Sequence, residues 1–453
     1  MKYPAYTDYK DSPIPWLPKV PSNWEVHRLK WAVTSCDNGV WGEEADGGPD
    51  DVACIRVADF DRLRCSVSAD NLTMRSIEAR QRASRQVRKG DLLIEKSGGG
   101  EKQLVGCVVR FDHEFPAVCS NFVARMGVAD GQNSRYWTYA HAALYAGRLN
   151  DPAIKQTTGI QNLDAGEYLN NLFAYAPAED QEKIATFLDW RTAQVDALIA
   201  KKRTLIERLR EQRQSLIAHH VTRGLNLQAS TRENSIPWLQ HMPAHWDAIP
   251  LGFLTSMSGG MTPSMNNPAY WDGDVPWVTP KDMKQAEVSD ATDHITDLAL
   301  SETGLSLVPP GSILIVVRGM ILAHSFPTAM VRAPVTINQD MKALRCTDRL
   351  DGDYLFWCLN GFADVLINQA QESAHGTKKM ETETIKKFVL PVPPVEEQRG
   401  IAKQLSNALQ KLDESSRLAI EAINRLTEYR SALITAAVTG QIDVRGVKVP
   451  API

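Results

Sequence analysis

The sequence lacks the features that define several large classes of protein. Its seven cysteines are odd in number and form no CxxC pair, so neither a zinc finger nor a disulfide framework is indicated. Its most apolar run, SILIVVRGMILA, is short and contains Arg318, and its N-terminus has no apolar signal-peptide core. Fifty basic residues against 54 acidic ones leave a net charge of −4, which excludes a uniformly basic nucleic-acid coat. We expect a cytoplasmic protein with reduced thiols, in which any DNA-binding surface is local.

Catalytic motifs are missing as well. The stretch NPAY (267–270) is similar to the N-P-P-Y motif of adenine methyltransferases, but it lacks the second proline and no F-x-G-x-G cofactor loop precedes it. His241 and His245 are four residues apart, yet Pro243 between them spoils a helical metal-binding face. No GxxxxGK[ST] phosphate loop and no nuclease or hydrolase arrangement stands out. The sequence therefore predicts no catalytic residue, no metal site and no cofactor bound by this chain.

What the sequence does contain is a tandem repeat. The stretch IPWLPKVPSNWEV starts at Ile14 and nearly recurs as IPWLQHMPAHWDA from Ile236, which is an offset of 222 residues. Towards the end of each half the offset becomes 217, because PAEDQEKIATFL (177–188) matches PVEEQRGIAKQL (394–405). The middles therefore differ by insertions while both ends agree. This pattern indicates one duplicated unit of about 220 residues rather than a solenoid array.

Each repeat predicts an α+β globular domain followed by a long helix. The first part mixes short β-like runs with helical patches, and the second begins with proline and acidic residues before a heptad-like series of apolar residues. That series consists of Leu188, Val195, Leu198, Leu205, Leu209 and Leu216 in the first helix, and of Leu405, Leu412, Leu426 and Leu433 in the second. Because 217 is a multiple of seven, the helices share one heptad register, and we expect an antiparallel intramolecular coiled coil with pseudo-twofold symmetry. Two unrelated amphipathic helices on local cores are the alternative.

The expected boundaries follow from these patterns. We expect a first globular domain over 1–175, a long helix over 176–225 and a linker over 226–234. A second globular domain follows over 235–392, then a second helix over 393–440 and a C-terminal tail over 441–453. About 40 helical residues at 1.5 Å each would span roughly 60 Å. Trp16 and Trp24, like Trp238 and Trp246, are expected to anchor the start of each domain rather than to contact bases.

The order of these features is distinctive because the whole series occurs twice. It consists of an IPWLPxxPxxW start, a globular domain, a P-x-E-[ED]-Q helix start and a long leucine-bearing helix. Within the globular domains, DLLIEKSGGGEKQLVG (91–106) and YWDGDVPWVTPKDM (270–283) belong to the same pattern. Over nearly its whole length the chain resembles the specificity (S) subunit of Type I restriction–modification enzymes.

The resemblance implies a non-catalytic subunit that recognises DNA. In that family each globular domain is a target recognition domain that reads one half of a split DNA sequence. Because the two domains differ in sequence, the implied target is asymmetric. The paired helices act as a ruler between the half-sites and as a docking surface for two methyltransferase subunits, and motor-endonuclease subunits join the complex. S-adenosylmethionine is then expected in the methyltransferase partner, and ATP and Mg in the motor-endonuclease partner.

Several polar segments, together with Arg318, are candidates for the DNA-binding surface. A basic run (75–89) suits phosphates, a KSGGG loop (96–100) allows close backbone approach, TTGIQNL (157–163) aligns with AHGTKKM (374–380), and VTPKDMK spans 278–284. Amide side chains suit adenine, and arginine suits guanine. The candidates are Arg75, Arg80, Arg82, Arg85, Arg88, Lys96, Ser97, Lys102, Gln161, Asn162, Thr279, Lys281, Lys284, Arg318, Lys378 and Lys379. Each segment also fits a solvated helix face, a plain turn or a surface loop, and Arg318 also fits a buried ion pair.

Two other functions remain open on the sequence alone. The chain could be a coiled-coil scaffold carrying two modules that bind protein or carbohydrate, for which its eleven tryptophans offer some support. It could also be a self-contained DNA methyltransferase or nuclease. A scaffold should show no salt-dependent affinity for DNA, and a methyltransferase should bind S-adenosylmethionine as an isolated chain.

Overall fold

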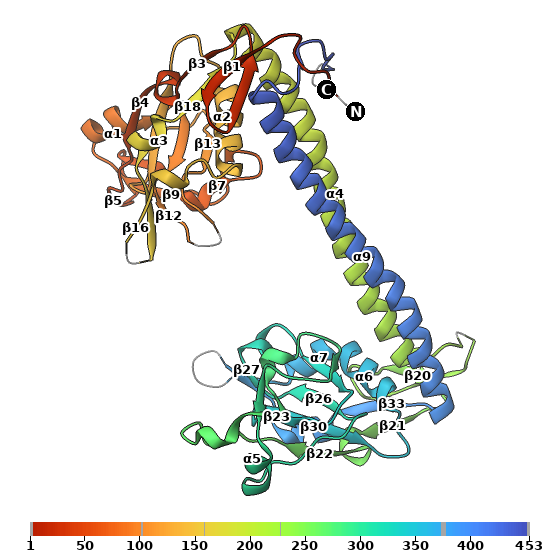
Figure 1. Cartoon of the computed structure of the whole chain (residues 1–453). Helices are drawn as coiled ribbons and strands as arrows, with labels where there is room; N and C mark the ends of the chain where they lie inside the picture. Colours follow the sequence, from red (N-terminus) through yellow and green to blue (C-terminus); the bar gives the residue numbers. More distant parts are fainter. Residues whose placement is uncertain (1–2, 101–102, 158, 227, 373–376, 451–453) are drawn as a thin grey trace. The chain divides into compact units, whose positions relative to one another are not determined.

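The chain folds into two compact units, and each unit takes one part of both long helices. The computed structural model describes residues 3–100, 103–157, 159–226, 228–372 and 377–450. Unit 1 comprises Met1–Lys202 and Glu421–Ile453, and unit 2 comprises Arg203–Ile420. Both units combine helices with β-sheets, in agreement with the mixed fold expected from the sequence (Figure 1). Within the described ranges, no helix has both the length and the apolar character that crossing a membrane requires.

The globular part of unit 1 is organised around strand β11 (Leu92–Glu95). Leu92 and Ile94 point into a core shared with α2 (Ser134–Ala146), whereas Leu93 points into a second core on the opposite face. One sheet of the described residues has the order β4 (Val33–Asn38), β15 (Val123–Val128), β11, β13 (Val108–Arg110), β8 (Ser66–Val67) and β7 (Phe60–Asp61). A second has the order β10 (Gln86–Val87), β14 (Ala117–Cys119), β6 (Asp51–Ile55), β9 (Thr73–Ser76) and β5 (Glu43–Glu44). The helices α1 (Ala79–Arg85) and α3 (Ala165–Leu169) complete this part of the unit.

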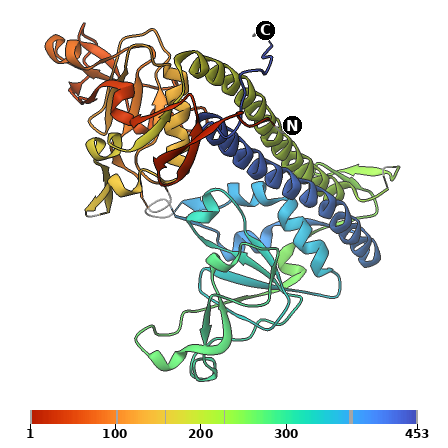
Figure 2. The same ribbon diagram turned by 45° about the horizontal axis from the view of Figure 1, so that its top comes forward.

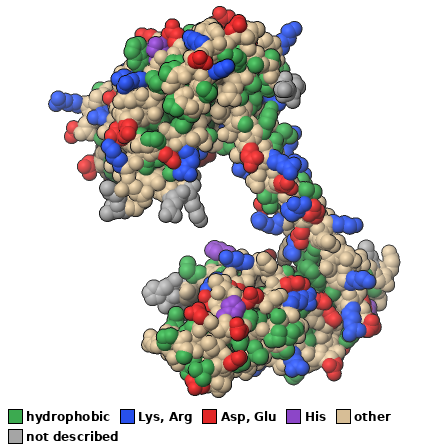
Figure 3. Space-filling model, in the orientation of Figure 1, with side chains coloured by type: hydrophobic (Ala, Val, Ile, Leu, Met, Phe, Trp, Pro, Cys, Tyr) green, Lys and Arg blue, Asp and Glu red, His purple; other side chains and the backbone are tan. Residues whose placement is uncertain are grey.

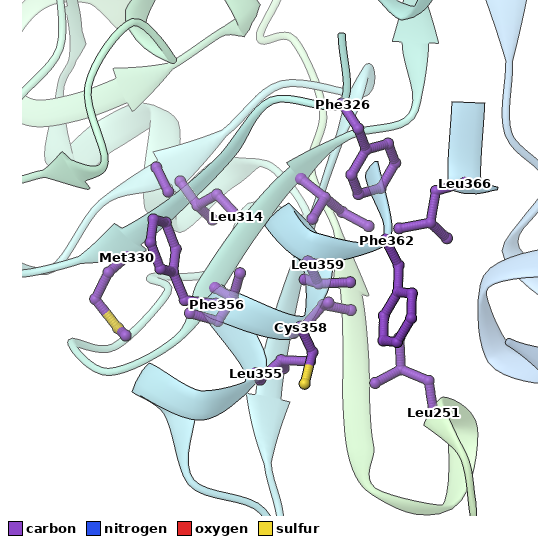
Figure 4. Close-up of a cluster of buried hydrophobic side chains, with 14 of the residues drawn as sticks. Leu251, Leu314, Phe326, Met330, Leu355, Phe356, Cys358, Leu359, Phe362 and Leu366 are labelled. Carbon is purple, nitrogen blue, oxygen red and sulfur yellow. The ribbon is translucent and has the colours of Figure 1, made fainter. Parts of the chain in front are cut away.

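Unit 2 repeats this plan around β26 (Ile313–Val316), whose four residues are all buried. Its larger sheet has the order β22 (Thr255–Gly259), β30 (Met341–Cys346), β26, β28 (Thr328–Val331) and β24 (Glu287–Val288). A smaller sheet has the order β25 (Asp293–Ile295), β23 (Trp271–Val278) and β29 (Thr336–Ile337). Helix α6 (Gly352–Gly361) covers the larger sheet, and Leu355, Phe356 and Leu359 pack beside Leu314 and Met330 (Figure 4). Three short helices complete the unit: α5 (Asp297–Glu302), α7 (Ala363–Asn368) and α8 (Thr382–Lys387).

The two long helices are α4 (Ala178–Arg223) and α9 (Val395–Val438). Each has two acidic residues in its first turn, where the exposed N–H groups favour negative charge. Gly224 and Gly440 follow the two helices with φ of 72° and 71°, the left-handed conformation that ends many helices. The 46-residue α4 fits the long helix predicted for the first repeat.

Within each unit, a segment of α4 packs against a segment of α9. In unit 1, Leu188 of α4 and Leu433 of α9 belong to one buried core, and Figures 1 and 2 both draw these segments side by side. In unit 2, the corresponding core contains Ile217 of α4 and Leu405 of α9. An ion pair joins the helices in each unit as well: Asp196 with Arg430 at 2.9 Å in unit 1, and Arg213 with Asp413 at 3.4 Å in unit 2.

Each repeated tryptophan-containing stretch contributes a strand to a hairpin at the start of its globular part. β1 (Tyr9–Ile14) pairs with β2 (Leu17–Pro21), and β19 (Thr231–Glu233) pairs with β20 (His241–Pro243). Trp24 is buried against Gly440, where a Cβ atom in place of the glycine hydrogen would lie 3.3 Å from the indole ring. Trp246 is buried against Gly224, with a corresponding distance of 2.8 Å. Each tryptophan therefore packs on the glycine that ends the long helix of the other repeat, and glycine leaves room for the ring.

The region where each tryptophan packs on the glycine that ends a long helix is called the joint below. Polar contacts stabilise this joint in both units. The Tyr136 hydroxyl donates to the carbonyls of Val438 at 3.1 Å and Ala174 at 3.4 Å. In unit 2, the Tyr354 hydroxyl donates to the carbonyls of Val221 at 3.3 Å and Pro391 at 3.0 Å. These carbonyls belong to the end of a long helix and to the strand β18 (Leu172–Tyr175) or β33 (Val389–Val392), which pairs with β3 (Glu25–Arg28) or β21 (Asp247–Pro250). Each hydroxyl therefore ties the globular part to the helix pair.

Candidate nucleic-acid interface

A small sheet in unit 1 carries three of the predicted site residues, Ser97, Gln161 and Asn162. β12 (Ser97–Gly98) pairs with β17 (Ile160–Leu163), which in turn pairs with β16 (Ile154–Thr157). Ser97 lies opposite Asn162, and its hydroxyl donates to Asn162 Oδ1 at 2.5 Å. The chain leaves β12 through Gly98 and Gly99, whose φ angles of 126° and 66° are rarely adopted by other residues. Asn162 is exposed, and its amide oxygen is oriented by Ser97.

A small sheet at the equivalent position of unit 2 carries basic residues instead. β27 (Arg318–Gly319) pairs with β32 (Lys378–Lys379), which pairs with β31 (Gln371–Glu372). Arg318 lies opposite Lys379, and both are exposed. Lys379 Nζ forms an ion pair with Glu381 at 2.8 Å. Arg318 is therefore not buried in an ion pair, which was one alternative for this position.

The two small sheets are counterparts by topology. β12 follows directly on the central strand β11, and β27 follows directly on the central strand β26. The partner strands meet them at 161–162 and 378–379, the two segments that align at an offset of 217 in the sequence. The fold therefore brings together Ser97 with Asn162 and Arg318 with Lys379, pairs that are far apart along the chain.

Other residues of the same segments in unit 1 are tied to neighbouring backbone or side chains. Gln161 is buried, and its Oε1 accepts the N–H of Val105 at 3.3 Å, so this side chain supports the loop beneath it. Lys96 Nζ donates to Asn38 Oδ1 at 2.6 Å. Lys102 lies outside the described residues.

The basic segment 75–89 packs on the strand-loop region 38–50. The guanidinium of Arg75 lies 4.6 Å from the centre of the Trp41 ring and donates to the carbonyls of Trp41 and Gly42, both at 3.0 Å. Two further arginines bind the same region, Arg82 through Asp50 at 3.3 Å and Arg85 through the carbonyl of Asn38. Arg80 and Arg88 are exposed. The segment therefore mixes half-buried and exposed arginines, which the sequence spacing did not distinguish.

The segment 278–284 in unit 2 is organised by a cap. Thr279 is buried, and its hydroxyl and N–H both donate to Asp282 Oδ2 at 2.9 Å. Burial opposes ionisation of Asp282, but hydrogen bonds from Thr292 and Thr279 outweigh it and hold the pKa of this carboxyl below its ordinary value. Lys281 Nζ pairs with Asp293 at 2.6 Å, and Lys284 is exposed. Thr279 thus stabilises the turn, and the two lysines present the polar groups.

Two exposed aromatic residues near β12 were missed by the sequence reasoning. Phe122 is 52% exposed, and its carbonyl accepts the N–H groups of Lys96 at 2.8 Å and Ser97 at 3.2 Å. Trp41 is 39% exposed beneath Arg75. Trp41 and Phe122 are far apart in the sequence, and no motif connects them. Only the pairing of the strands shows that they lie near the same polar sheet.

Charge is distributed without a dominant sign around these residues. On the face drawn in Figure 3, basic and acidic side chains are interspersed over the globular part of each unit. In the part of the chain that the structure describes, no group of three or more His, Cys, Asp or Glu side chains could hold a metal ion. The polar sheets therefore stand out by their geometry rather than by net charge.

Comparison with protein families identifies the second half of the chain. A family model described as the Type I restriction modification DNA specificity domain matches residues 243–424. This part of the chain therefore matches the Type I specificity family. The matched range contains β27, β32 and most of the segments that form unit 2, and the resemblance inferred from the doubled motifs is confirmed.

Curated relatives carry the same description. The chain is 32% identical over 181 residues to the Type I restriction enzyme EcoR124I/EcoR124II specificity subunit of Escherichia coli, a match covering 40% of this chain and 44% of that one. It is 30% identical over 170 residues to the MjaIX specificity subunit of Methanocaldococcus jannaschii, covering 36% and 38%. Each match therefore spans less than half the length of the relative. Both relatives are described as specificity subunits, the family that the repeated motifs resemble.

Solved structures share the fold over almost the whole chain. A structure described as showing complex assembly and conformational transition of the type I R-M system has a TM-score of 0.72 at 15% identity, covering 93% of this chain and 99% of that one. The HsdS subunit from Thermoanaerobacter tengcongensis has a TM-score of 0.52 at 14% identity, covering 93% and 98%. At such identities the likeness establishes the fold of this chain alone.

Proposed function

We propose that this chain is the non-catalytic DNA-recognition subunit of a Type I restriction–modification complex. Each unit reads one half of a bipartite, asymmetric DNA target, and methyltransferase and motor-endonuclease subunits supply the chemistry. The family model, whose description includes DNA specificity, supports recognition of DNA as the function. The remaining parts of the proposal rest on the contacts within each unit.

The observation that carries the proposal is the pair of equivalent sheets with different polar groups. In unit 1 the sheet presents the Asn162 amide oriented by Ser97, and an amide suits the edge of adenine. In unit 2 the same position presents Arg318 beside Lys379, which suit guanine and phosphate. One backbone arrangement that offers two chemistries fits a protein that reads two different half-sites.

We propose further that α4 and α9 form one antiparallel coiled coil that sets the distance between the half-sites. The inter-helix ion pairs support this, because the step from Asp196 to Arg213 along α4 equals the step from Arg430 back to Asp413 along α9. A constant register of this kind is what continuous pairing of two antiparallel helices requires. A helix pair of roughly 60 Å would separate the half-sites by between one and two turns of DNA at ~34 Å per turn.

The exposed apolar residues of the long helices support docking of methyltransferase subunits there. Leu198 in unit 1 is 48% exposed, and in unit 2 Leu205 is 39% and Leu418 51% exposed. Side chains of this size on a helix surface favour burial by a partner. We propose that each methyltransferase subunit covers one such set.

Methylation mapping tests the proposal directly. The full chain is co-expressed with the methyltransferase subunits encoded beside it, and modified adenines are mapped on plasmid DNA. A split, asymmetric motif is expected. Exchange of residues 27–170 for the equivalent domain of another specificity subunit should change one half of the motif and leave the other unchanged.

Three results would contradict the proposal. An assembled complex that methylates no split motif would refute DNA recognition, and a domain exchange that alters both halves would refute the assignment of one half-site to each unit. DNA affinity that does not fall with rising salt would favour a scaffold instead, since phosphate contacts release counterions.

A further inference from the structure

A pocket beside the polar sheet of unit 1 has the lining of a nucleobase site. Its volume is about 450 Å³, and the aromatic rings of Trp41 and Phe122 contribute to its wall together with Arg56, Ser120 and Asn121. Aromatic faces accept any base by stacking, and the apolar wall leaves hydrogen bonding to a few polar groups. None of its lining residues is among the DNA-binding candidates predicted from the sequence.

One polar atom of this lining has no partner. Ser120 is 2% exposed, and within the described residues its Oγ makes no hydrogen bond. An unpaired buried hydroxyl costs free energy, and it is rare in a native protein unless a ligand or water satisfies it. Ser120 is one of the lining residues, so this hydroxyl lies beside the space that a base would occupy.

The aromatic wall is held in place before any ligand arrives. Arg75 covers the Trp41 ring and is itself fixed by two backbone carbonyls, so the indole cannot rotate freely. Gly39 brings the Trp41 loop against the 119–120 backbone, where a methyl group would lie 2.0 Å from the Cys119 carbonyl oxygen. The Arg56 guanidinium is oriented by Asp59 at 3.2 Å. This preorganisation lowers the entropy lost on binding.

The surrounding charge suits the phosphates that flank a base. Arg56 lies in the lining, and Arg75 lies over Trp41. The backbone N–H of Lys96 donates to the Phe122 carbonyl. These cations complement a nucleotide better than an apolar peptide.

The corresponding region of unit 2 has a different chemistry on the same backbone frame. Gly260 makes the close approach there, since a methyl group on it would lie 1.8 Å from the Ile337 carbonyl oxygen. Met261 N–H donates to that oxygen at 3.1 Å, as Val40 N–H does to Cys119 at 2.8 Å. The N–H of Val317 donates to Asp340 at 2.8 Å, as Lys96 does to Phe122. Asp340 therefore stands where unit 1 has Phe122.

The polar groups of that region satisfy one another. The Thr262 hydroxyl, in the Trp41 position, donates to Gln339. Asn338, in the Ser120 position, accepts the N–H of Asp340 at 3.1 Å and donates to its carboxylate at 3.4 Å. Of these two corresponding regions, as far as the structure describes them, the one in unit 1 combines an aromatic pocket with an unpaired hydroxyl.

We propose that the pocket formed by Trp41, Phe122, Arg56 and Ser120 takes one nucleobase of the half-site bound by unit 1 and contributes to its specificity. The base stacks on the aromatic wall, and its edge bonds to Ser120 Oγ. This inference rests on the proposed function, since it presumes that unit 1 contacts DNA.

The test measures binding by the full chain, assembled with its methyltransferase subunits, to duplexes that carry the motif found by methylation mapping. Trp41→Ala and Phe122→Ala should each weaken binding roughly five- to hundredfold, the range measured when aromatic stacking on a base is removed. Trp31→Ala is the matched control, because Trp31 is 63% exposed in the same unit and lies outside the pocket lining. It should bind like the unmodified chain.

A scan of single abasic nucleotides identifies the contact. The unmodified chain should lose affinity at one position of the unit 1 half-site, and Trp41→Ala should be insensitive to the abasic change at that position only. Ser120→Ala separates binding from structure: it removes an unpaired hydroxyl, so its melting temperature should be unchanged or raised while target affinity falls.

The possible failures are distinguishable. If Trp41→Ala and Phe122→Ala bind as tightly as Trp31→Ala, or if they lose the same factor at every abasic position, the pocket takes no base. If the unmodified complex itself shows no preference for its mapped motif, the proposed function fails instead.

Discussion

Unit 1 and unit 2 build the same joint from differently connected chain. In unit 2 the chain runs without a break from Gly224 through β19 and β20 to Trp246. Unit 1 assembles the joint from two separate segments, residues 3–24 and 440–450, which are joined by the N–H of Asp443 donating to the carbonyl of Pro4 at 2.7 Å. The packing of tryptophan on glycine is the same in both. The comparison teaches that burial of the indole, and not chain continuity, defines this joint.

Polar details around the joint differ between the units. Trp246 Nε1 donates to Glu397 at 3.1 Å, whereas Trp24 Nε1 makes no hydrogen bond within the described ranges. The residue that aligns with Glu397 is Asp180, one methylene shorter, which faces Arg445 at 3.6 Å. A shorter carboxylate and an added cation thus leave one indole unpaired.

A second difference lies inside the globular parts. His141 and Tyr168 of unit 1 are buried and lie within hydrogen-bond distance, 2.7 Å from Nδ1 to the hydroxyl oxygen. The aligned positions of unit 2 are Leu359 and Ile385, both buried. Unit 1 therefore contains a titratable group where unit 2 has an apolar contact.

The largest expected effect breaks the common feature of the joint. Trp24→Ala and Trp246→Ala should each lower the free energy of unfolding by about 3–5 kcal/mol through lost burial and a residual cavity. Trp246→Ala should cost more, because it also leaves Glu397 without its indole partner. Urea unfolding measures the total, and Trp16→Ala, at a position 37% exposed, is the control. Equal losses for all three variants would show that the tryptophans do not define the joint.

Acidification should separate the two units. Burial lowers the pKa of His141 from 6.5 to about 4, so the unfolded chain takes up a proton that the native state resists. Stability is therefore fully present above about pH 6.5 and is lost as the pH falls towards 4, by roughly 3 kcal/mol at most. Hydrogen exchange should show α2 opening in this window while α6 changes less. The double variant His141→Leu/Tyr168→Phe should remove the difference, and persistence of it would assign the effect to other groups.

Loss of the buried amide at each helix start should have matched effects. Gln181 accepts the N–H of Asn133 at 3.0 Å and donates to the Ala176 carbonyl at 2.8 Å. Gln398 accepts the N–H of Asp351 and donates to the Pro393 carbonyl, both at 2.8 Å. Gln181→Leu and Gln398→Leu should each cost about 2 kcal/mol, because buried backbone groups lose their partners. Thermal unfolding checks this, and a loss in one unit only would break the equivalence.

Exchange of the two acidic residues should have the smallest effect. Asp180→Glu lengthens the side chain towards Trp24 Nε1 and should stabilise unit 1 by about 1 kcal/mol, while Glu397→Asp should destabilise unit 2 by a similar amount. Local hydrogen exchange near β2 and β20 provides the measurement. The opposite signs would show that one methylene accounts for the difference, whereas changes of the same sign would point to Arg445.

Much of the architecture was predictable because it repeats along the chain. The duplicated stretches predicted equivalent tryptophans at 24 and 246, and both are buried. The α+β character and the long helix α4 agree with the sequence patterns, and the family resemblance is confirmed. Heptad spacing was less exact at single positions: Leu198 is exposed, whereas Ile199 beside it is buried. A periodic pattern locates a helix face but does not decide between adjacent apolar residues at its edge.

The candidate site was predictable only at the level of segments. Aligning 161–162 with 378–379 located the strands that meet Ser97 and Arg318. It did not show that Gln161 is buried while Asn162 is exposed, or that Thr279 acts as a cap. Alternation along a strand decides the first, and a contact three residues away decides the second.

The sequence by itself determined the duplication, the class of fold, the long helix α4 and the resemblance to the specificity family, because these are written in consecutive residues and in their spacing. Only the tertiary structure decided which polar groups remain exposed and that Trp41, Phe122 and Ser120 line one pocket. The physical reason is that burial and hydrogen-bond satisfaction depend on partners from distant strands. No local pattern of residues records where those partners will lie.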